Sequence, residues 1–291
     1  MADQITSVEE THSDVIAEPR AADDVRIQPG GYLLELSLDW LVLRASQNIH
    51  RLLDRSHVTL IGEPLGEFVH AQALHDLRNL FSRLSGTTGI ARAYRVRLTD
   101  ETGLSDIAFQ VSDGRVILEA VPSPEHGFGE AFGTIGGLVG GLGNAKGQAL
   151  LDGGARRMRA LTGYDRVTLV SADQRAESSR GSFVAPCDFS LDCPALYTDG
   201  ADEPVAVFPR QPEETSVHAA MMRSPTPETL DQLRGQGIRA MLRVGFDSDG
   251  ETGEFRCDCR TAREASLEVH AAAELFAQLF AMRLAMDRLK S

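Results

Sequence analysis

The chain reads RIQPGGYLLELSLDWLVLRASQNIHRLL over residues 26–53. The tetrapeptide Gln-Pro-Gly-Gly at 28–31 is typical of a tight turn. Residues 32–36 and 40–45 favour two strands, and the spacing of the apolar residues in 48–53 predicts a helix. The stretch therefore predicts that the first domain begins with a turn, two strands and a helix.

The residues that follow extend this pattern. Apolar spacing over 65–84 predicts one or two helices. Asp113-Gly114 is a strong hairpin signal between the second and third of three further strands, expected at 94–98, 105–111 and 115–120. Two strands, helices and then three strands is the element order of a PAS domain, which we assign to residues 26–126.

Two segments flank this domain. Residues 1–25 are acidic and low in large apolar side chains, which predicts a flexible arm. Residues 127–154 are rich in glycine and favour a linker. A phosphate-binding loop would need Ser or Thr after a Gly-Lys pair, whereas Lys146 precedes Gly147 and Gln148 follows, so the linker interpretation is preferred.

The remaining residues, 155–291, predict a second αβ unit. Thr226 is suited to cap a helix over 227–236, and Gly237 to end it. The other expected elements are a helix at 155–162, strands at 166–171, 182–185, 240–246 and 254–259, and a long helix at 264–289. This order is typical of a GAF domain. The predicted fold class is α+β, a PAS domain followed by a GAF domain, each an antiparallel sheet flanked by helices.

Length, charge and hydropathy limit the partners and the cellular location that we expect for the protein. The 291 residues suffice for two domains, and the net charge of −13 argues against nucleic acid or an anionic membrane as a direct partner. No apolar run reaches about 18 residues, and the polar N-terminus does not resemble a signal peptide. We therefore expect a cytoplasmic protein whose four cysteines are reduced.

Catalytic and metal-binding patterns are weak. Cys257 and Cys259 are separated by one residue, whereas structural zinc sites use gaps of about two to four. Together with Cys187 and Cys193 they are read as ordinary buried or edge cysteines. No nucleophile–histidine set can be assembled from the sequence. We expect no enzymatic activity and no metal.

Four stretches carry a resemblance to a known family. They are IQPGGYLLEL at 27–36, LTGYDRV at 161–167, RSPTPETLDQLRGQGIRAML at 223–242 and LFAQLFAMRL at 275–284. From about Arg26 to its C-terminus the chain resembles the PAS–GAF photosensory core of bacterial phytochromes. The resemblance implies a biliverdin in the GAF pocket, attached to a Cys in the arm before the Ile-Gln-Pro turn. Here that position holds Ile16, and no Cys precedes the turn, so attachment through the arm is excluded.

The resemblance also implies an altered pocket. The family's two pocket histidines fall on Thr229 and Cys259, and a pocket aromatic falls on Val170. The Cys that attaches the bilin in plant-type relatives falls on Glu228. A vestigial bilin site remains, with Arg223 and Ser224 matching propionate ligands and Asp192 matching a faint Pro-Ala-Ser-Asp-Ile-Pro segment. The segment around 187–192 is shortened, so we expect that the GAF domain does not encircle the N-terminal arm.

The terminal helix offers the clearest interaction surface. A 4-3-4-3 spacing of apolar residues predicts a dimer interface, which Phe276 and Phe280 would widen. The residues of this seam are Leu275, Leu279, Met282, Met286 and Leu289. Packing on the domain's own sheet is the alternative.

The leading hypothesis is a degenerate phytochrome-like sensory or interaction module. It would act in signalling through contacts with a protein partner, as a homodimer and without covalent bilin. The alternative is a sensor that binds biliverdin or another tetrapyrrole non-covalently through Asp192, Arg223 and Ser224. A lyase or transferase acting on bilins is a third hypothesis, which no catalytic set supports.

Overall fold

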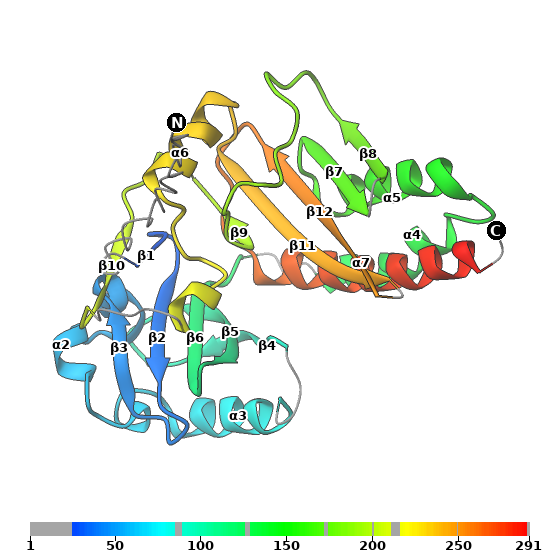
Figure 1. Cartoon of the computed structure of the whole chain (residues 1–291). Helices are drawn as coiled ribbons and strands as arrows, with labels where there is room; N and C mark the ends of the chain where they lie inside the picture. Colours follow the sequence, from blue (N-terminus) through cyan, green and yellow to red (C-terminus); the bar gives the residue numbers. More distant parts are fainter. Residues whose placement is uncertain are drawn as a thin grey trace, which may run out of the picture.

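The computed structural model describes residues 25–84, 89–125, 129–171, 174–199, 201–210, 216–248 and 250–289. They form two antiparallel sheets, of seven and five strands, with helices packed against each (Figure 1). We call the parts built around them the first and second domains. The arm expected over 1–25 lies outside the described residues except for Val25. Within the described part of the chain, no helix is long and apolar enough to cross a membrane.

The first sheet has the strand order β1-β10-β3-β2-β6-β5-β4. Asp113 and Gly114 both have positive φ, 48° and 70°, as the tight hairpin predicted between β5 and β6 requires. One face of the sheet buries Leu34 and Phe109 against Leu77 of α3. The elements are β1 (Arg26–Ile27), β2 (Tyr32–Leu36), β3 (Val42–Ser46), η1 (Gln47–Ile49), α1 (His50–Leu53), α2 (His57–Leu60), η2 (Leu65–Glu67), α3 (Ala71–Ser82), β4 (Ala91–Arg97), β5 (Leu104–Ser112) and β6 (Arg115–Pro122).

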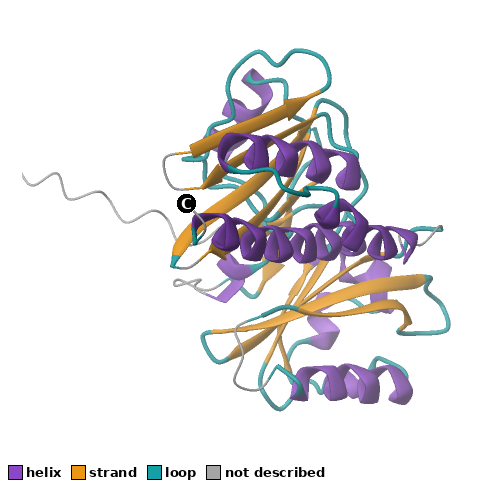
Figure 2. Cartoon of the chain, turned by 90° about the vertical axis from the view of Figure 1, so that its right-hand side faces the viewer, coloured by secondary structure: helices purple, strands orange, loops and turns teal. Residues whose placement is uncertain are grey.

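The second sheet has the order β8-β7-β12-β11-β9, with α5 and α7 against its inner face (Figure 2). Phe255 of β12 packs there on Phe276 and Phe280 of α7. The elements are α4 (Gly129–Gly140), α5 (Gly147–Thr162), β7 (Arg166–Ser171), β8 (Gln174–Ser179), β9 (Leu196–Tyr197), β10 (Val205–Phe208), η3 (Ser216–Ala219), α6 (Pro227–Gly235), β11 (Ala240–Ser248), β12 (Glu251–Cys259) and α7 (Leu267–Arg288).

The glycine-rich segment 127–154 is not a simple linker. It contains all of α4 and the first half of α5, which was expected to begin only at Ala155. Glycine here permits close packing, because a Cβ on Gly154 would lie 2.5 Å from Cε2 of Phe280. The same residue type that signals a flexible linker therefore marks a helix–helix contact.

The strand expected over 182–185 is also wrong. The edge strand is β8, in which Ala176 points into the core while Arg175 and Glu177 alternate with it on the other side. Gly181, at φ 80°, turns the chain away after β8, so residues 182–185 run as a loop.

The two domains share a strand, because β10 belongs to the first sheet although it lies between β9 and α6 in the sequence. Val207 and Phe208 pair with β3, and Val205 pairs with Ile27 of β1. The other edge of β1 meets the same loop, through a bridge between Ile27 and Arg223. A single boundary near residue 126 therefore does not separate the two domains, because β10 returns to the first sheet.

The loop of residues 196–224 also holds the N-terminal turn. The amide of Gln28 donates to Leu196 O at 2.6 Å, and its Oε1 accepts from the N–H of Thr198 at 2.8 Å. The two ends of the loop meet where Leu196 N–H donates to Met221 O at 3.0 Å. The arm over 1–24 lies outside the described residues. Residues 26–28, which follow it, are contacted on both edges by the loop 196–224, although the segment around 187–192 is shortened.

A candidate ligand face on the second sheet

The second sheet has two chemically different faces. Along β7 and β12, side chains alternate strictly, so Val167 and Cys257 point into the core while Arg166 and Asp258 point to the outer face. The register places Arg166 opposite Asp258, and Thr168 opposite Arg256. Antiparallel sheets often expose such a polar face to water. Here it is buried.

Three charges form the centre of this outer face. Arg166 donates to Asp258 Oδ2 from Nε at 2.9 Å and from Nη2 at 2.7 Å, and Arg256 Nε donates to Asp258 Oδ1 at 2.8 Å. The three side chains are each no more than 1% exposed. Arg256 Nη2 is buried without a hydrogen-bond partner among the described residues. Such a cluster is costly to bury and contributes specificity more readily than stability.

The loop of residues 185–193 covers this charge cluster, and four arginines of the sheet donate hydrogen bonds to its backbone. Arg166 Nη1 donates to Ala185 O at 2.7 Å, and Arg175 Nη2 donates to Cys187 O at 3.2 Å. Arg256 donates to the Asp188 carbonyl, and Arg243 Nη1 donates to Cys193 O at 3.0 Å. Backbone carbonyls of the loop thus accept hydrogen bonds from all four guanidinium groups.

The cysteines are divided between the two faces. Cys187 and Cys193 are buried in the loop, and Cys257 and Cys259 lie in the core on the inner face. Burial raises the pKa of Cys187 to about 11 and also raises the pKa of Cys193. No cluster of three or more metal-ligating side chains occurs in the described ranges.

Two of the three predicted bilin ligands meet. Arg223 forms an ion pair with Asp192, whose side chain is 59% exposed while that of Arg223 is 13% exposed. Ser224 lies beside them in sequence, but its hydroxyl donates to Pro225 O at 3.4 Å and its N–H donates to Arg26 O at 2.7 Å. The guanidinium that would hold a propionate is therefore already bound to a carboxylate of the chain.

The other pocket positions hold small side chains. Thr229 is buried in the first turn of α6, where its N–H donates to the capping oxygen of Thr226 at 3.3 Å, as the sequence predicted. Cys259 lies on the inner side and donates to Asp165 Oδ2 at 3.4 Å. Val170 stands opposite Glu254 on the outer face. These positions offer no imidazole and no aromatic ring to a chromophore.

Two cavities of the described residues do not bring the predicted ligands together. An open cavity of about 510 Å³ at the β7–β8 edge is lined by Arg166, Arg175, Glu177, Ser179 and residues 181–186, without Asp192, Arg223 or Ser224. A larger cavity, about 830 Å³, lies where the domains meet, and its charged lining consists of one arginine, Arg263, and four carboxylates, those of Glu125, Asp199, Asp202 and Glu264. Its charge does not suit a ligand that carries propionates.

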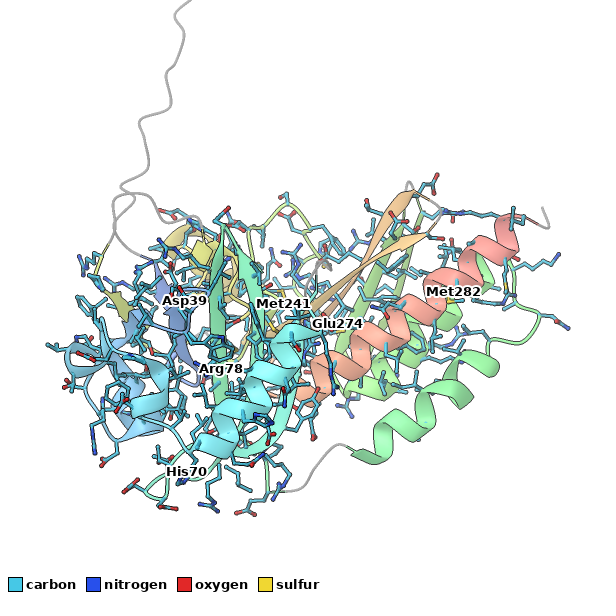
Figure 3. The ribbon with its side chains drawn as sticks, turned by 90° about the horizontal axis from the view of Figure 1, so that it is seen from below. Asp39, His70, Arg78, Met241, Glu274 and Met282 are labelled. Atoms are coloured by element: carbon cyan, nitrogen blue, oxygen red, sulfur yellow. The ribbon has the colours of Figure 1, made fainter. Side chains whose placement is uncertain are left out.

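The predicted dimer seam lies on α7. Four of its residues are exposed, Leu275 at 39%, Met282 at 61%, Met286 at 52% and Leu289 at 82%, and Leu279 is half-buried against the core. Phe276 and Phe280, expected to widen the stripe, are fully buried instead. Figure 3 shows Met282 on the part of α7 that extends beyond the first domain, whereas Glu274 lies at the part of α7 that is close to the first domain.

The sequence analysis did not predict the buried cluster of Arg166, Arg256 and Asp258. The strings RVTLV at 166–170 and EFRCDC at 254–259 alternate polar and apolar residues, which is the signal for one apolar and one charged face. That alternation could have identified Arg166, Arg256 and Asp258 as neighbours. It could not have shown that a distant loop covers them.

Comparison with known proteins identifies the fold. Residues 23–122 match the family model described as a PAS fold. The chromophore-binding domain of RpBphP3, an unusual bacteriophytochrome from R. palustris, is 22% identical with a TM-score of 0.73, over 94% of this chain and 99% of that domain. The photosensory core module of the Stigmatella aurantiaca phytochrome is 22% identical with a TM-score of 0.74, over 94% of this chain and 60% of that module. No curated protein matches. The predicted α+β fold, a PAS domain followed by a GAF domain as in bacteriophytochromes, is confirmed.

Proposed function

We propose that this chain is a degenerate phytochrome-like PAS–GAF sensory module that acts through protein contacts, without covalently attached bilin and without enzymatic activity. The loop Ala185–Cys193 carries the proposal, because four arginines fasten it onto the outer face of the GAF sheet. The absence of cysteine before residue 187 agrees with it. A tetrapyrrole on this face would have to displace the loop, and the four guanidinium groups would lose their hydrogen bonds to its backbone carbonyls.

Non-covalent binding of biliverdin or another tetrapyrrole is the second candidate. It is supported by the similar structures, which are named as chromophore-binding domains, and by the position of Arg223. In this case a propionate would replace the exposed Asp192 carboxylate as the partner of Arg223, with Ser224 beside it.

Incubation with biliverdin separates the two candidates. We expect no red-absorbing band after gel filtration, and no zinc-induced fluorescence of the denatured protein on a gel. A red band that survives gel filtration and weakens in Arg223→Ala would establish non-covalent binding. Fluorescence of the denatured protein would show that a covalent bond forms, contrary to both candidates. A bacteriophytochrome chromophore-binding domain is the positive control for each readout.

We further propose that the partner surface is the exposed stripe of α7, and that its first occupant is a second copy of the chain. Exposed methionine and leucine side chains in one row are uncommon on a surface without a partner. The row is continuous from Leu275 to Leu289, and its heptad spacing matches that of an identical helix.

A further inference from the structure

Strand β8 forms one outer edge of the second sheet. It stands first in the order β8-β7-β12-β11-β9, and Figure 1 shows it at the end of the sheet that lies away from the first domain. All six of its residues pair with β7 without a register shift. Among the described residues no strand pairs with its other edge, so β8 can be extended by a further strand.

The backbone groups of alternate residues face outwards from β8. In an antiparallel pair every second residue exchanges hydrogen bonds with the partner strand, and the residues between them point away from it. The side-chain amide of Gln148 donates to Arg175 O at 3.0 Å, which identifies Arg175 as an outward-facing residue. Glu177 and Ser179 follow in the same phase. Within the described ranges their outward N–H and C=O groups have no backbone partner.

The other sheet edges are short or irregular. β1 and β9 contain two residues each. The register of β4 shifts between Ala93 and Val96, where Arg95 has a φ of 54°. Very short strands and bulges protect an edge from pairing with another chain. β8 has neither device, and it contains no proline and no lysine.

Exposed arginines give the β8 edge a positive charge. Arg175, Arg180 and Arg260 are 43%, 71% and 43% exposed. Two carboxylates lie against them, since Glu177 is 3.9 Å from Arg175 and Asp165 pairs with the other two arginines. Three cations against two anions leave a positive edge on a chain whose net charge is −13. A strand that binds here is therefore selected for negative charge.

An open cavity lies beside the same edge. Its volume is about 510 Å³, and its walls include Arg175 of β8 and residues 181–186. Val184 in the wall is 82% exposed, and the ring centroid of Phe183 lies 4.1 Å from Cζ of Arg166. Alternate side chains of an added strand would enter this cavity, where a carboxylate would meet Arg175.

We propose that the β8 edge binds an extended acidic segment of a protein partner, which joins the sheet as an antiparallel strand. The residues opposite Arg175 and Ser179 are acidic, and a hydroxyl residue lies opposite Glu177. Directly opposite residues share a face of the sheet, so the acidic side chains lie on the arginine-rich outer face. Main-chain hydrogen bonds supply the affinity and alternate side chains supply the specificity. The proposal rests on the proposed function through protein contacts, but its surface is separate from the stripe of α7, so each can fail alone.

A labelled heptapeptide, Thr-Glu-Val-Thr-Val-Glu-Thr, reproduces this register and serves as the probe. Its fluorescence anisotropy is recorded while the full chain is added. We expect saturable binding that weakens as salt is raised, and no binding of the same peptide with lysine in place of both glutamates. Arg175→Glu should weaken binding about tenfold, because attraction across the strand pair becomes repulsion. Arg115→Glu, at a similarly exposed arginine of the first domain, should leave the affinity unchanged.

Two methylated peptides test the backbone contact. N-methylation of the central threonine removes an N–H that faces β8 and should abolish binding, whereas N-methylation of the following valine removes an N–H that faces away. Equal affinity of the two methylated peptides, equal affinity of the lysine peptide, or an unchanged affinity in R175E would each overturn the proposal. So would a failure of the unmodified peptide to bind at up to about 1 mM. Hydrogen-exchange protection of β8 that rises with protein concentration alone would assign the edge to a second copy of the chain and overturn the acidic partner as its occupant.

Discussion

At the scale of single residues, Asp258 is the most sensitive position of the second sheet. It is the only carboxylate that both buried guanidinium groups, those of Arg166 and Arg256, contact among the described residues. Asp258→Asn removes the charge but nearly keeps the shape. Because it leaves two buried cations without an anion, we expect a loss of about 3–5 kcal/mol in the free energy of unfolding, measured by urea titration.

The matched control for this change is Glu177→Gln. Glu177 pairs with Arg175 on the same face of the sheet, but its side chain is 39% exposed and the distance is 3.9 Å. Water replaces such a partner easily, so the loss should be below about 1 kcal/mol. Equal effects of the two substitutions would show that the outer face is hydrated and that the loop does not seal it.

The buried His270 of α7 makes the free energy of unfolding depend on pH. Burial, and then the charge of Arg92, lower its pKa to about 3, while the bond to the Arg243 carbonyl works the other way. Because the pKa of His270 is lower in the folded state, the neutral imidazole contributes to the free energy of unfolding above the unfolded-state pKa of about 6.5. This contribution is lost progressively as the pH falls below that value.

The test compares His270→Gln with the wild type. Glutamine can accept from Arg92 and donate to Arg243 O, as neutral histidine does at 3.0 and 3.2 Å. Between pH 7 and pH 5 the wild type should lose about 2 kcal/mol more unfolding free energy than H270Q, by linkage. Chemical unfolding at the two pH values measures this difference, and parallel changes in both proteins would refute it.

At the scale of elements, the contact between α5 and α7 depends on glycine. A Cβ at position 154 would lie 2.5 Å from Cε2 and 2.9 Å from Cζ of Phe280. Gly154→Ala should therefore destabilise the protein by about 1–3 kcal/mol through overpacking, although alanine favours helix by about 1 kcal/mol. Gly136→Ala in α4, where a Cβ would meet nothing within 4 Å, should instead stabilise by about 0.5–1 kcal/mol. Thermal unfolding of both variants checks the opposite signs.

The same glycines explain which elements the sequence could predict. Strands 32–36 and 166–171 were predicted with the bounds that the structure has, because their composition and the turns beside them are local signals. Composition could not distinguish a flexible linker from helices α4 and α5. It also could not predict that Val207 pairs with Ser46, because nothing local encodes a contact across such a length of chain. The buried charge cluster was missed for that reason too, since its cover is a loop.

At the scale of the whole molecule, the domains are joined by more than their covalent connection. Ala108 and Val121 of the first sheet belong to the same apolar cluster as Phe276 and Phe280 of α7. Arg92 adds an ion pair to Glu274 on that helix. One end of α7 therefore contacts the first domain, while the part beyond it carries the exposed stripe (Figure 3). A partner bound to the stripe would contact the same rigid element that packs against the PAS sheet.

We predict that two copies of the chain form a homodimer through the exposed stripe of α7. Fully burying one Leu or Met side chain contributes about 1.5–3 kcal/mol. Met282 and Met286 are 61% and 52% exposed, and a symmetric pair would bury two copies of each. With Leu275 and Leu289 the gain can exceed the cost of association, about 4–15 kcal/mol.

Replacing both methionines by glutamate would place four like charges in the seam of the pair. Because both side chains are exposed, M282E/M286E should keep its fold and sediment as a monomer, while the wild type sediments as a dimer at micromolar concentration. The control is L38E/V58E, which adds the same charge at exposed apolar positions of the first domain and should remain a dimer. A wild type that is monomeric at high micromolar concentration would leave the stripe without a second copy as its partner. An unchanged dimer in M282E/M286E would place the interface on another surface.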